Sequence, residues 1–405
     1  MAVAAQPVLS VDNRLPKLAP PAAQLLKKTG LKWFATGENS DYLSTDFVRV
    51  TPPELERFQE AATELYKRIV ETAYYVAEAG LWKEMGIPHH AVELRQHSLR
   101  KEEGAYLIGR FDLSGGLEGV PIHLLEFNAD TCSLIPETAK FQQLYWSQER
   151  KDLMEPPFNN LVASLKNRFE TILADFPGKT PYMLISSLGH EEDWLNTDVI
   201  AEAARKADFK EVQNLALSKV IFAEDEGIYM QLGPEDYRRY DFWFKFIPWE
   251  FILFEEPELF QILERIILDD LCMVLNPASS ILYQSKGLMT YLYERYPDQD
   301  YLLKTAFSKA AFPNNKYVRK PSFGRMGENI AYHDGGSEPA YETEGDYGDF
   351  KPVFQELADF NEDWQDHRYQ PSVFWTGEPS ALCFRRQDDL IIDDDAEFVG
   401  HHIAF

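Results

Sequence analysis

Apolar residues recur with two different periods in the first third of the chain. Between residues 53 and 79 they fall on one face of a helix, and Thr51 is placed as its N-cap. The segments 105–113 (AYLIGRFDL) and 121–129 (PIHLLEFNA) instead have strand-like composition and are joined by the Gly-rich stretch SGGLEGV. The pattern predicts a long helix followed by a β-hairpin with a loop of several residues.

A different pattern begins at residue 181. The apolar run YMLISSL precedes an acidic turn, a helical segment at 196–207 and the strand-like runs VIFA and GIYMQL. This alternation predicts a small α/β layer. Helical spacing returns at 258–275 and around 286–296, and the remaining C-terminal part is rich in strand and turn residues.

The chain is therefore expected to have an α+β fold with several packed parts, because 405 residues exceed the size at which one core usually keeps growing. We expect an Ala/Pro-rich arm at 1–45 and a part with the hairpin at 46–180. The small α/β lobe would follow at 181–257, and a second large part at 258–405.

Charge limits the partners of this protein. The chain has 40 Lys and Arg against 66 Asp and Glu, a formal net charge of −26. Such a surface repels nucleic acid and anionic lipid, so we expect neither as a partner. The longest apolar stretches are interrupted by charges, the N-terminus lacks the basic region of a signal peptide, and three separated cysteines suit a reducing compartment. We expect a cytoplasmic protein that binds phosphates only through a local basic pocket or a metal ion.

Oxygen-bearing side chains alternate with apolar ones on the second strand of the predicted hairpin. Glu126, Asn128 and Asp130 would share one face, and Asp112 on the first strand could lie opposite Glu126 and Asn128. Carboxylates and an amide, with no His or Cys nearby, suit Mg²⁺, which takes further ligands from substrate phosphates. A half-exposed strand whose polar residues face water is the alternative, and the spacing alone does not exclude it.

The segment YVRKPSFGRMGENI concentrates positive charge in an acidic chain. Arg319, Lys320 and Arg325 surround Gly324 and Gly327. Glycine lets backbone N–H groups approach an anion closely, and a Lys or Arg completes the cradle. The flanks predict strands, so this hairpin loop could close over phosphates, although the GxxxxGK[ST] pattern of a P-loop is absent. A surface hairpin with scattered basic residues is equally compatible with the sequence.

Four further charged residues each have two interpretations. Lys286 begins a helical stretch, where a lysine normally faces solvent. Arg385 ends a predicted strand and could pair with the acids that follow or face a transferring phosphate. Glu191 and Glu192 follow a strand, where α/β folds place ligand contacts, but acids also favour the first turn of a solvated helix.

Several segments together resemble the glutathionylspermidine synthase family, including its single-domain acid–amine ligase members. Their order and spacing are kept over nearly the whole chain after residue 40. The matching text comprises GRFD at 109–112, LEFNADTCSL at 125–134, HEEDW at 190–194, KFIPWE at 245–250, LNPASSILYQSKGLMTYLYERYP at 275–297, KYVRKPSFGRMGENI at 316–330, VFQELADF at 353–360 and FRRQDDLIIDDDAEFVGH at 384–401.

The resemblance implies an ATP-grasp fold, in which ATP lies between two β-rich lobes. The part at 46–180 would hold the metal ligands, the part at 258–405 the nucleotide lysines, and 181–257 a small lobe like a pre-ATP-grasp domain. Matched position by position, Asp112, Glu126 and Asn128 would bind two Mg²⁺ ions. Arg110 would contact phosphate, and Arg385 matches the arginine that stabilises the transferring phosphoryl group.

The resemblance also implies contacts to the nucleotide and the substrates. Lys286 and Lys320 would bind the ATP phosphates, with the loop from Gly324 to Gly327 closing over them. Gln355 and the backbone around Leu357 would bind adenine. The family positions that line the thiol-peptide site correspond here to Thr131, Glu191 and Glu192.

The implied activity joins a small-molecule acid to an amine. The acid would attack the γ-phosphorus of ATP to give an acyl phosphate, and the amine would then displace phosphate. Phe246, Pro248 and Met326 depart from the synthase pattern, so the sequence leaves the acid, the amine and the oligomeric state open, and we find no room for the N-terminal amidase domain of bifunctional synthases. A nucleotide-binding scaffold without turnover is the alternative function, but the retained ligands and cations favour an enzyme.

Overall fold

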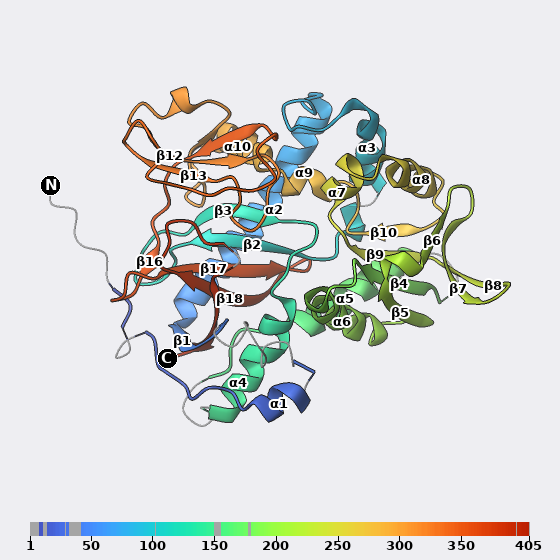
Figure 1. Cartoon of the computed structure of the whole chain (residues 1–405), viewed down its shortest axis with the longest axis horizontal. Coiled ribbons are helices and arrows are strands. Elements are labelled where there is room, and N and C mark those ends of the chain that lie inside the picture. Colours follow the sequence, from blue (N-terminus) through green and yellow to red (C-terminus); the bar gives the residue numbers. More distant parts are fainter. Residues whose placement is uncertain are drawn as a thin grey trace.

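The structure is a computed structural model that describes residues 8–10, 14–28, 30–31, 42–101, 103–149, 155–176, 180–393 and 395–404. Part of the predicted arm at 1–45 therefore lies outside the described residues. The described chain has a mixed α/β fold built around four sheets. Figure 1 shows two of them stacked on the left, with the smaller sheets and their helices to the right.

The largest sheet combines strands from both ends of the chain. Its order is β1–β19–β18–β17–β2–β3, with β16 paired to β17, and only β1 and β19 run parallel. The long helix α2 packs against one face. The elements span Leu43–Val50 (β1), Pro52–Glu78 (α2), Gly109–Ser114 (β2), His123–Asn128 (β3), Asn361–Glu362 (β16), Arg368–Trp375 (β17), Pro379–Gln387 (β18) and Glu397–Ile403 (β19).

Helix α2 follows the predicted pattern closely. Pro occupies its first turn, and Thr51 and Glu54 form a capping box, which satisfies backbone N–H groups that the helix start leaves unpaired. Its apolar stripe, including Phe58 and Leu65, is buried against the sheet face that carries Val373 and Phe384. The opposite face carries Phe374 and Cys383 in a second core. The alternation of side chains along the strands thus separates two cores.

A second sheet is wholly parallel, in the order β10–β9–β4–β5. Figure 1 shows α5 and α6 beside it and a three-stranded sheet, β6–β7–β8, extending from it. The elements span Leu161–Ala174 (α5), Tyr182–Ser187 (β4), Glu191–Arg205 (α6), Glu211–Ala216 (β5), Val220–Ala223 (β6), Gly227–Gly233 (β7), Asp236–Tyr240 (β8), Phe242–Phe246 (β9), Pro257–Leu268 (α8) and Met273–Leu275 (β10).

Two predictions for this region were wrong in their boundaries. The helix expected at 258–275 is α8, which ends at Leu268, and 273–275 is strand β10. Its Val274 and Leu275 are fully buried beside β9, so tertiary packing overrides the helical spacing. The helix expected at 196–207 begins at Glu191, because acids suit the first helical turn. Strand β10, which follows the predicted boundary at 257/258, pairs with β9, which precedes it. The division of the chain into parts stays a prediction.

The third sheet is antiparallel, in the order β11–β15–β12–β13–β14, and packs against helix α10. It lies next to β3, the edge strand of the largest sheet (Figure 1). The hairpin predicted around the glycine loop is confirmed, since β12 pairs with β13. The elements span Lys286–Arg295 (α10), Thr305–Ala306 (β11), Lys316–Pro321 (β12), Ala331–Asp334 (β13), Tyr341–Glu342 (β14) and Pro352–Gln355 (β15).

The remaining helices join these layers. None of the described helices is both long and apolar enough to cross a membrane. They span Ala23–Lys28 (α1), Val92–Lys101 (α3), Gln142–Glu149 (α4), Trp249–Phe254 (α7) and Ser280–Gln284 (α9).

Candidate functional site

The hairpin β2–β3 brings the predicted metal ligands together. Asp112 lies directly opposite Glu126, and Arg110 opposite Asn128, as the alternation of residues predicts. Asn128 Nδ2 donates to Asp112 Oδ2 at 2.9 Å and to Glu126 Oε1 at 3.3 Å. Three oxygen-bearing side chains therefore meet at one point of the sheet.

Asp130 does not join this set, contrary to the expectation from alternation. Strand β3 ends at Asn128, and the Asp130 carboxylate instead accepts from Lys245 Nζ at 2.7 and 2.8 Å and from the Trp249 N–H at 2.7 Å. Both charged groups are fully buried, and burial lowers the pKa of Lys245 and raises that of Asp130. The pair joins the hairpin to the parallel sheet.

Asp112 is held by Arg110 on its own strand and by Ser372 on the neighbouring strand β17. Arg110 donates from Nε to Oδ1 at 2.7 Å and from Nη2 to Oδ2 at 2.8 Å, and its Nη1 donates to the Ser133 carbonyl at 2.9 Å. Ser372 on β17 donates to Oδ1 at 2.9 Å. Sequence reasoning missed Ser372, because its cross-strand position depends on a pairing that no local pattern shows.

The antiparallel sheet β11–β15–β12–β13–β14 and helix α10 form the neighbouring lobe. Two of its lysines, Lys286 on α10 and Lys320 on β12, reach the same point. Lys286 Nζ lies 2.9 Å from Glu126 Oε2 and donates to the Gly324 carbonyl at 2.9 Å. Lys320 Nζ donates to Gln355 Oε1 at 2.8 Å and to the Leu125 carbonyl at 3.2 Å. These contacts bring the predicted phosphate lysines to the predicted metal ligands.

Burial and charge oppose each other at these groups. Burial alone would raise the pKa of Glu126, but the Lys286 and Lys320 ammonium groups outweigh it and hold that pKa at about 2. Burial lowers the pKa of Lys320 to about 8, although Glu126 opposes this shift. At neutral pH the site therefore contains charged carboxylate and ammonium groups side by side.

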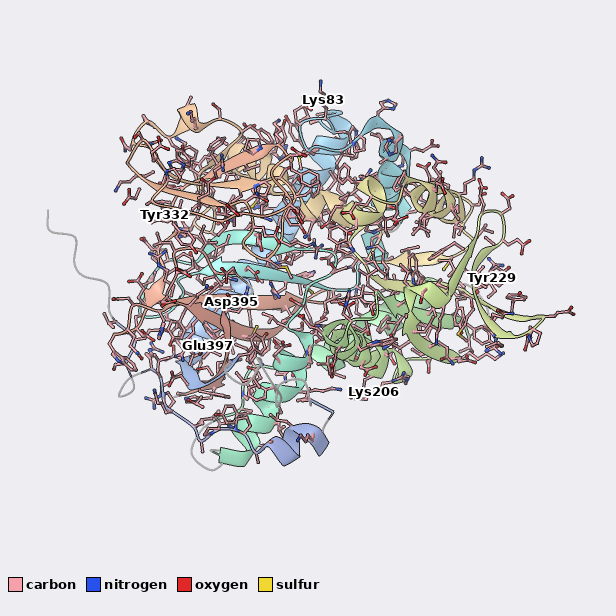
Figure 2. The ribbon with its side chains drawn as sticks, in the orientation of Figure 1. Lys83, Lys206, Tyr229, Tyr332, Asp395 and Glu397 are labelled. Atoms are coloured by element: carbon pink, nitrogen blue, oxygen red, sulfur yellow. The ribbon has the colours of Figure 1, made fainter. Side chains whose placement is uncertain are left out.

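A cavity lies where the two lobes meet, with about 820 Å³ of space that is partly open to solvent. Tyr332 of β13, labelled in Figure 2, is part of its wall. The lining residues are Leu125, Glu126, Lys286, Val318, Lys320, Pro321, Gly324, Arg325, Met326, Gly327, Glu328, Ile330, Tyr332, Gln355, Glu356, Ala358, Phe360, Gln370, Leu390, Ile391 and Ile392.

This wall contains most of the predicted nucleotide contacts. Gln355 also donates to the Leu124 carbonyl at 3.2 Å, which fixes β15 beside β3. Glu356 and Ala358 line the cavity, whereas Leu357 between them is half-buried outside its lining. Gln370 is a lining residue that sequence reasoning missed.

The glycine loop, residues 322–330, is held in place by the hydrogen bonds of Arg325, the residue after Gly324. Arg325 donates to Glu250 Oε1 from Nε at 3.0 Å and from Nη2 at 2.7 Å, and to Thr131 Oγ1 at 2.9 Å. Gly327 has φ +73°, and a Cβ there would lie 2.9 Å from the Asp393 Cβ. The loop thus closes one side of the cavity and brings predicted substrate residue Thr131 next to it. Sequence reasoning missed Glu250.

Arg385 lies on the same face of the largest sheet as Asp112. It is on β18, one strand beyond the β17 partner of Asp112. It is the β18 partner of Gln370 and donates to the Asp393 carbonyl. Its Nε is buried without a partner among the described residues. Arg385 thus lies behind the segment that contacts Gly327, near the cavity wall formed by Ile391.

The predicted substrate acids Glu191 and Glu192 are exposed residues in the first turn of α6. Sequence reasoning missed the buried Glu137, which begins a short π-helical turn at Glu137–Phe141 and accepts from the Tyr42 hydroxyl at 2.8 Å. Burial raises the pKa of Glu137 to about 7, and the charge of Glu192 adds to the shift. Glu137 and Glu192 are therefore electrostatic neighbours.

The predicted oxygen ligands would suit magnesium better than a transition metal. Among the described residues, no three His, Cys, Asp or Glu side chains are grouped to hold a metal. Asp112, Glu126 and Asn128 supply only two carboxylates and an amide. Mg²⁺ accepts such a small protein set, since it keeps waters and takes ligands from phosphates.

Comparisons with known proteins identify the family to which the chain belongs. A Haemophilus influenzae protein whose name gives acid–amine ligase as a provisional activity is 25% identical over 401 residues, covering 95% of this chain and 97% of that protein. Trypanothione synthetase of Crithidia fasciculata is 27% identical over 119 residues, which are 29% of this chain but 18% of that enzyme.

A solved structure shares the fold over most of its length. A glutathione synthetase-like effector from Globodera pallida, in its apo form, matches with a TM-score of 0.57 at 9% identity, covering 89% of this chain and 90% of the effector. The model of one family, described as glutathionylspermidine synthase preATP-grasp, matches residues 14–404. The chain belongs to this glutathionylspermidine synthase family, whose named relatives are ligases.

Proposed function

We propose that the protein is an ATP- and Mg²⁺-dependent ligase that joins a carboxylate to an amine, with the two lobes around the cavity forming an ATP-grasp fold. The observation that supports this most directly is the meeting of opposite charges at the cavity wall. Lys286 and Lys320 come from the lobe of the glycine loop, and Asp112 and Glu126 from the largest sheet. An acidic protein can bind a triphosphate only where cations and metal ligands converge in this way.

The cavity wall suggests the pose of ATP. Adenine would lie against Gln355 and the backbone around Leu357, and the phosphates would extend towards Lys286 and Lys320 under the glycine loop. Asp112, Glu126 and Asn128 would hold two Mg²⁺ ions. When bound, these ions would offset the charge of the phosphates.

The side chains around the phosphate end account for the two steps. The substrate carboxylate would attack the γ-phosphorus of ATP to form an acyl phosphate, and ADP would leave, with Arg110 and Arg385 stabilising the charge on the transferred group. The glycine loop, held by the Arg325–Glu250 contact, would exclude water that hydrolyses the acyl phosphate. An amine then forms the C–N bond as phosphate leaves.

The acid and amine would enter from the side of α6. Thr131 contacts the glycine loop through Arg325, and Glu191 and Glu192 present negative charge suited to an amine. The name of the family, glutathionylspermidine synthase, makes glutathione and spermidine the first substrates to test.

The direct test measures ADP release and amide formation together, with a panel of acids and amines that begins with glutathione and spermidine. ADP is expected only when both substrates are present, and mass spectrometry should detect the condensed product. Lys320→Ala and Arg385→Ala should lose more than about 99% of the activity, because each removes a cation from the phosphoryl site. Lys316→Ala, on the exposed end of the same strand as Lys320, should retain it.

Two outcomes would contradict the proposal. ATP binding without turnover across the whole panel would favour a nucleotide-binding scaffold. ADP release that never accompanies a new C–N bond would favour phosphotransfer or simple hydrolysis.

A further inference from the structure

Every oxygen of the two metal-binding carboxylates already has a donor from the chain itself. Asp112 Oδ1 accepts from Arg110 and Ser372, and Oδ2 from Arg110 and Asn128. Glu126 Oε1 accepts from Asn128, and Oε2 is paired with Lys286. A metal ion arriving alone would have to displace these donors.

The donors differ in how firmly they are held. Arg110 is anchored by both oxygens of Asp112 and by the Ser133 carbonyl, and it is buried. Lys286 has two partners, the Glu126 carboxylate and the carbonyl of Gly324 in the glycine loop. A lysine is a point charge on a flexible stem, so Lys286 can exchange partners more easily than the guanidinium can.

Electrostatics makes the exchange depend on a second anion. If Mg²⁺ took the Glu126 oxygen alone, it would leave a buried ammonium beside a divalent cation, which is strongly unfavourable. A triphosphate in the same cavity provides the missing negative charge for Lys286. Asn128 adds a second barrier, because it directs its NH₂ group at both carboxylates and must turn to offer its oxygen.

We propose, on the basis of the nucleotide site proposed above, that Lys286 is an exchangeable counter-ion that lets the protein bind divalent metal only together with a triphosphate. Without nucleotide, Lys286 neutralises Glu126 and blocks the metal position. When the phosphates attract Lys286, the Glu126 carboxylate becomes available as a ligand. The lysine therefore couples metal binding to nucleotide binding.

Equilibrium dialysis against micromolar Mn²⁺ tests this with the full chain. Because the protein is acidic, Glu126→Gln defines the background of surface binding. Without nucleotide, the wild type should hold no more Mn²⁺ than Glu126→Gln. With the non-hydrolysable analogue AMP-PNP, the wild type should gain site-specific metal, and Glu126→Gln should not.

The matched pair Lys286→Met and Lys320→Met isolates the counter-ion. Each variant removes one positive charge from the same cavity, but only Lys286 contacts a carboxylate oxygen, whereas Lys320 contacts Gln355 and the Leu125 carbonyl. Without nucleotide, Lys286→Met should bind Mn²⁺ at least about tenfold more tightly than the wild type. Lys320→Met should show a much smaller gain.

A second measurement does not depend on Lys286→Met being stable. In EDTA, Glu126→Gln should bind metal-free AMP-PNP at least about tenfold more tightly than the wild type, because Lys286 no longer has a competing carboxylate. Site-specific Mn²⁺ in the nucleotide-free wild type, equal gains in the two lysine variants, or unchanged nucleotide affinity in Glu126→Gln would each overturn the exchange. If no form bound AMP-PNP, the proposed function would fail instead, and the metal-only comparison would still decide the role of Lys286.

Discussion

Ser372 Oγ donates a hydrogen bond of 2.9 Å to Asp112 Oδ1 from a strand 260 residues further along the chain. The two residues are direct cross-strand partners on β17 and β2, and both are buried. The bond therefore connects the C-terminal part of the largest sheet to the carboxylate that we propose as a metal ligand.

Ser372→Ala should lower the free energy of unfolding by about 2 kcal/mol, because it removes a buried donor from a charged acceptor. Urea denaturation measures this. Ser380→Ala is the matched control, since Ser380 is equally buried but donates to the neutral Phe374 carbonyl, and its loss should cost about 1 kcal/mol. Equal losses would show that the charge of Asp112 does not strengthen its bond.

Lys245→Met should be among the most destabilising single changes. It leaves the Asp130 carboxylate buried without its ammonium partner, which should cost about 3–5 kcal/mol in urea denaturation. Adding Asp130→Asn should recover part of the loss. Lys101→Met, which breaks an exposed pair with Asp270, should cost less than about 1 kcal/mol. Similar losses from the two lysines would contradict the buried pairing.

Glu137 should make stability depend on pH in a defined direction. Burial raises its pKa from 4.5 to about 7, so the folded protein keeps a proton that the unfolded chain loses between these values. Its contribution to stability is present at low pH and is lost, by about 3 kcal/mol, as the pH rises through that window. Glu137→Gln should remove this slope in denaturation series at pH 4.5 to 7. An unchanged slope would show that the carboxyl is not responsible.

Gly327→Ala should weaken nucleotide binding. The positive φ disfavours any side chain there, and the new Cβ would press on Asp393, so the glycine loop would shift away from the cavity. We expect about a tenfold loss of AMP-PNP affinity by calorimetry. Gly80 has a similar positive φ with open space where a Cβ would lie, so Gly80→Ala should reduce stability slightly and leave nucleotide affinity unchanged. A similar affinity loss in both variants would indicate a general effect of strain.

The hairpin could be predicted because its information is local. Alternation placed Glu126 and Asn128 on one face, and the paired strand placed Asp112 opposite them. The same rule failed for Asp130, because the strand ends two residues earlier and a distant lysine determines the side chain's direction. A lysine in the middle of the apolar run FWFKF was the available signal for Lys245, since such a residue must find a buried partner.

The remaining site residues required the family resemblance or the structure. Lys286 begins α10 like many solvent-facing lysines, and only the resemblance gave it a role before the fold placed it beside Glu126. Ser372 and Gln370 belong to a strand that pairs with residues far away in the sequence, and no spacing in one segment encodes that partner. Glu137 lies in a short π-helical turn, which has no distinctive residue pattern.

The contacts between edge strand β3 and the neighbouring lobe have a consequence for self-association. The consecutive carbonyls of Leu124 and Leu125 accept hydrogen bonds from Gln355 and Lys320. Unpaired strand edges can pair with strands of other molecules. Here the side chains of Gln355 and Lys320, from the neighbouring lobe, cover this part of the edge of β3. If that lobe moved away to admit a ligand, the edge of β3 would be exposed to solvent. Each opening would then carry a transient risk of self-association.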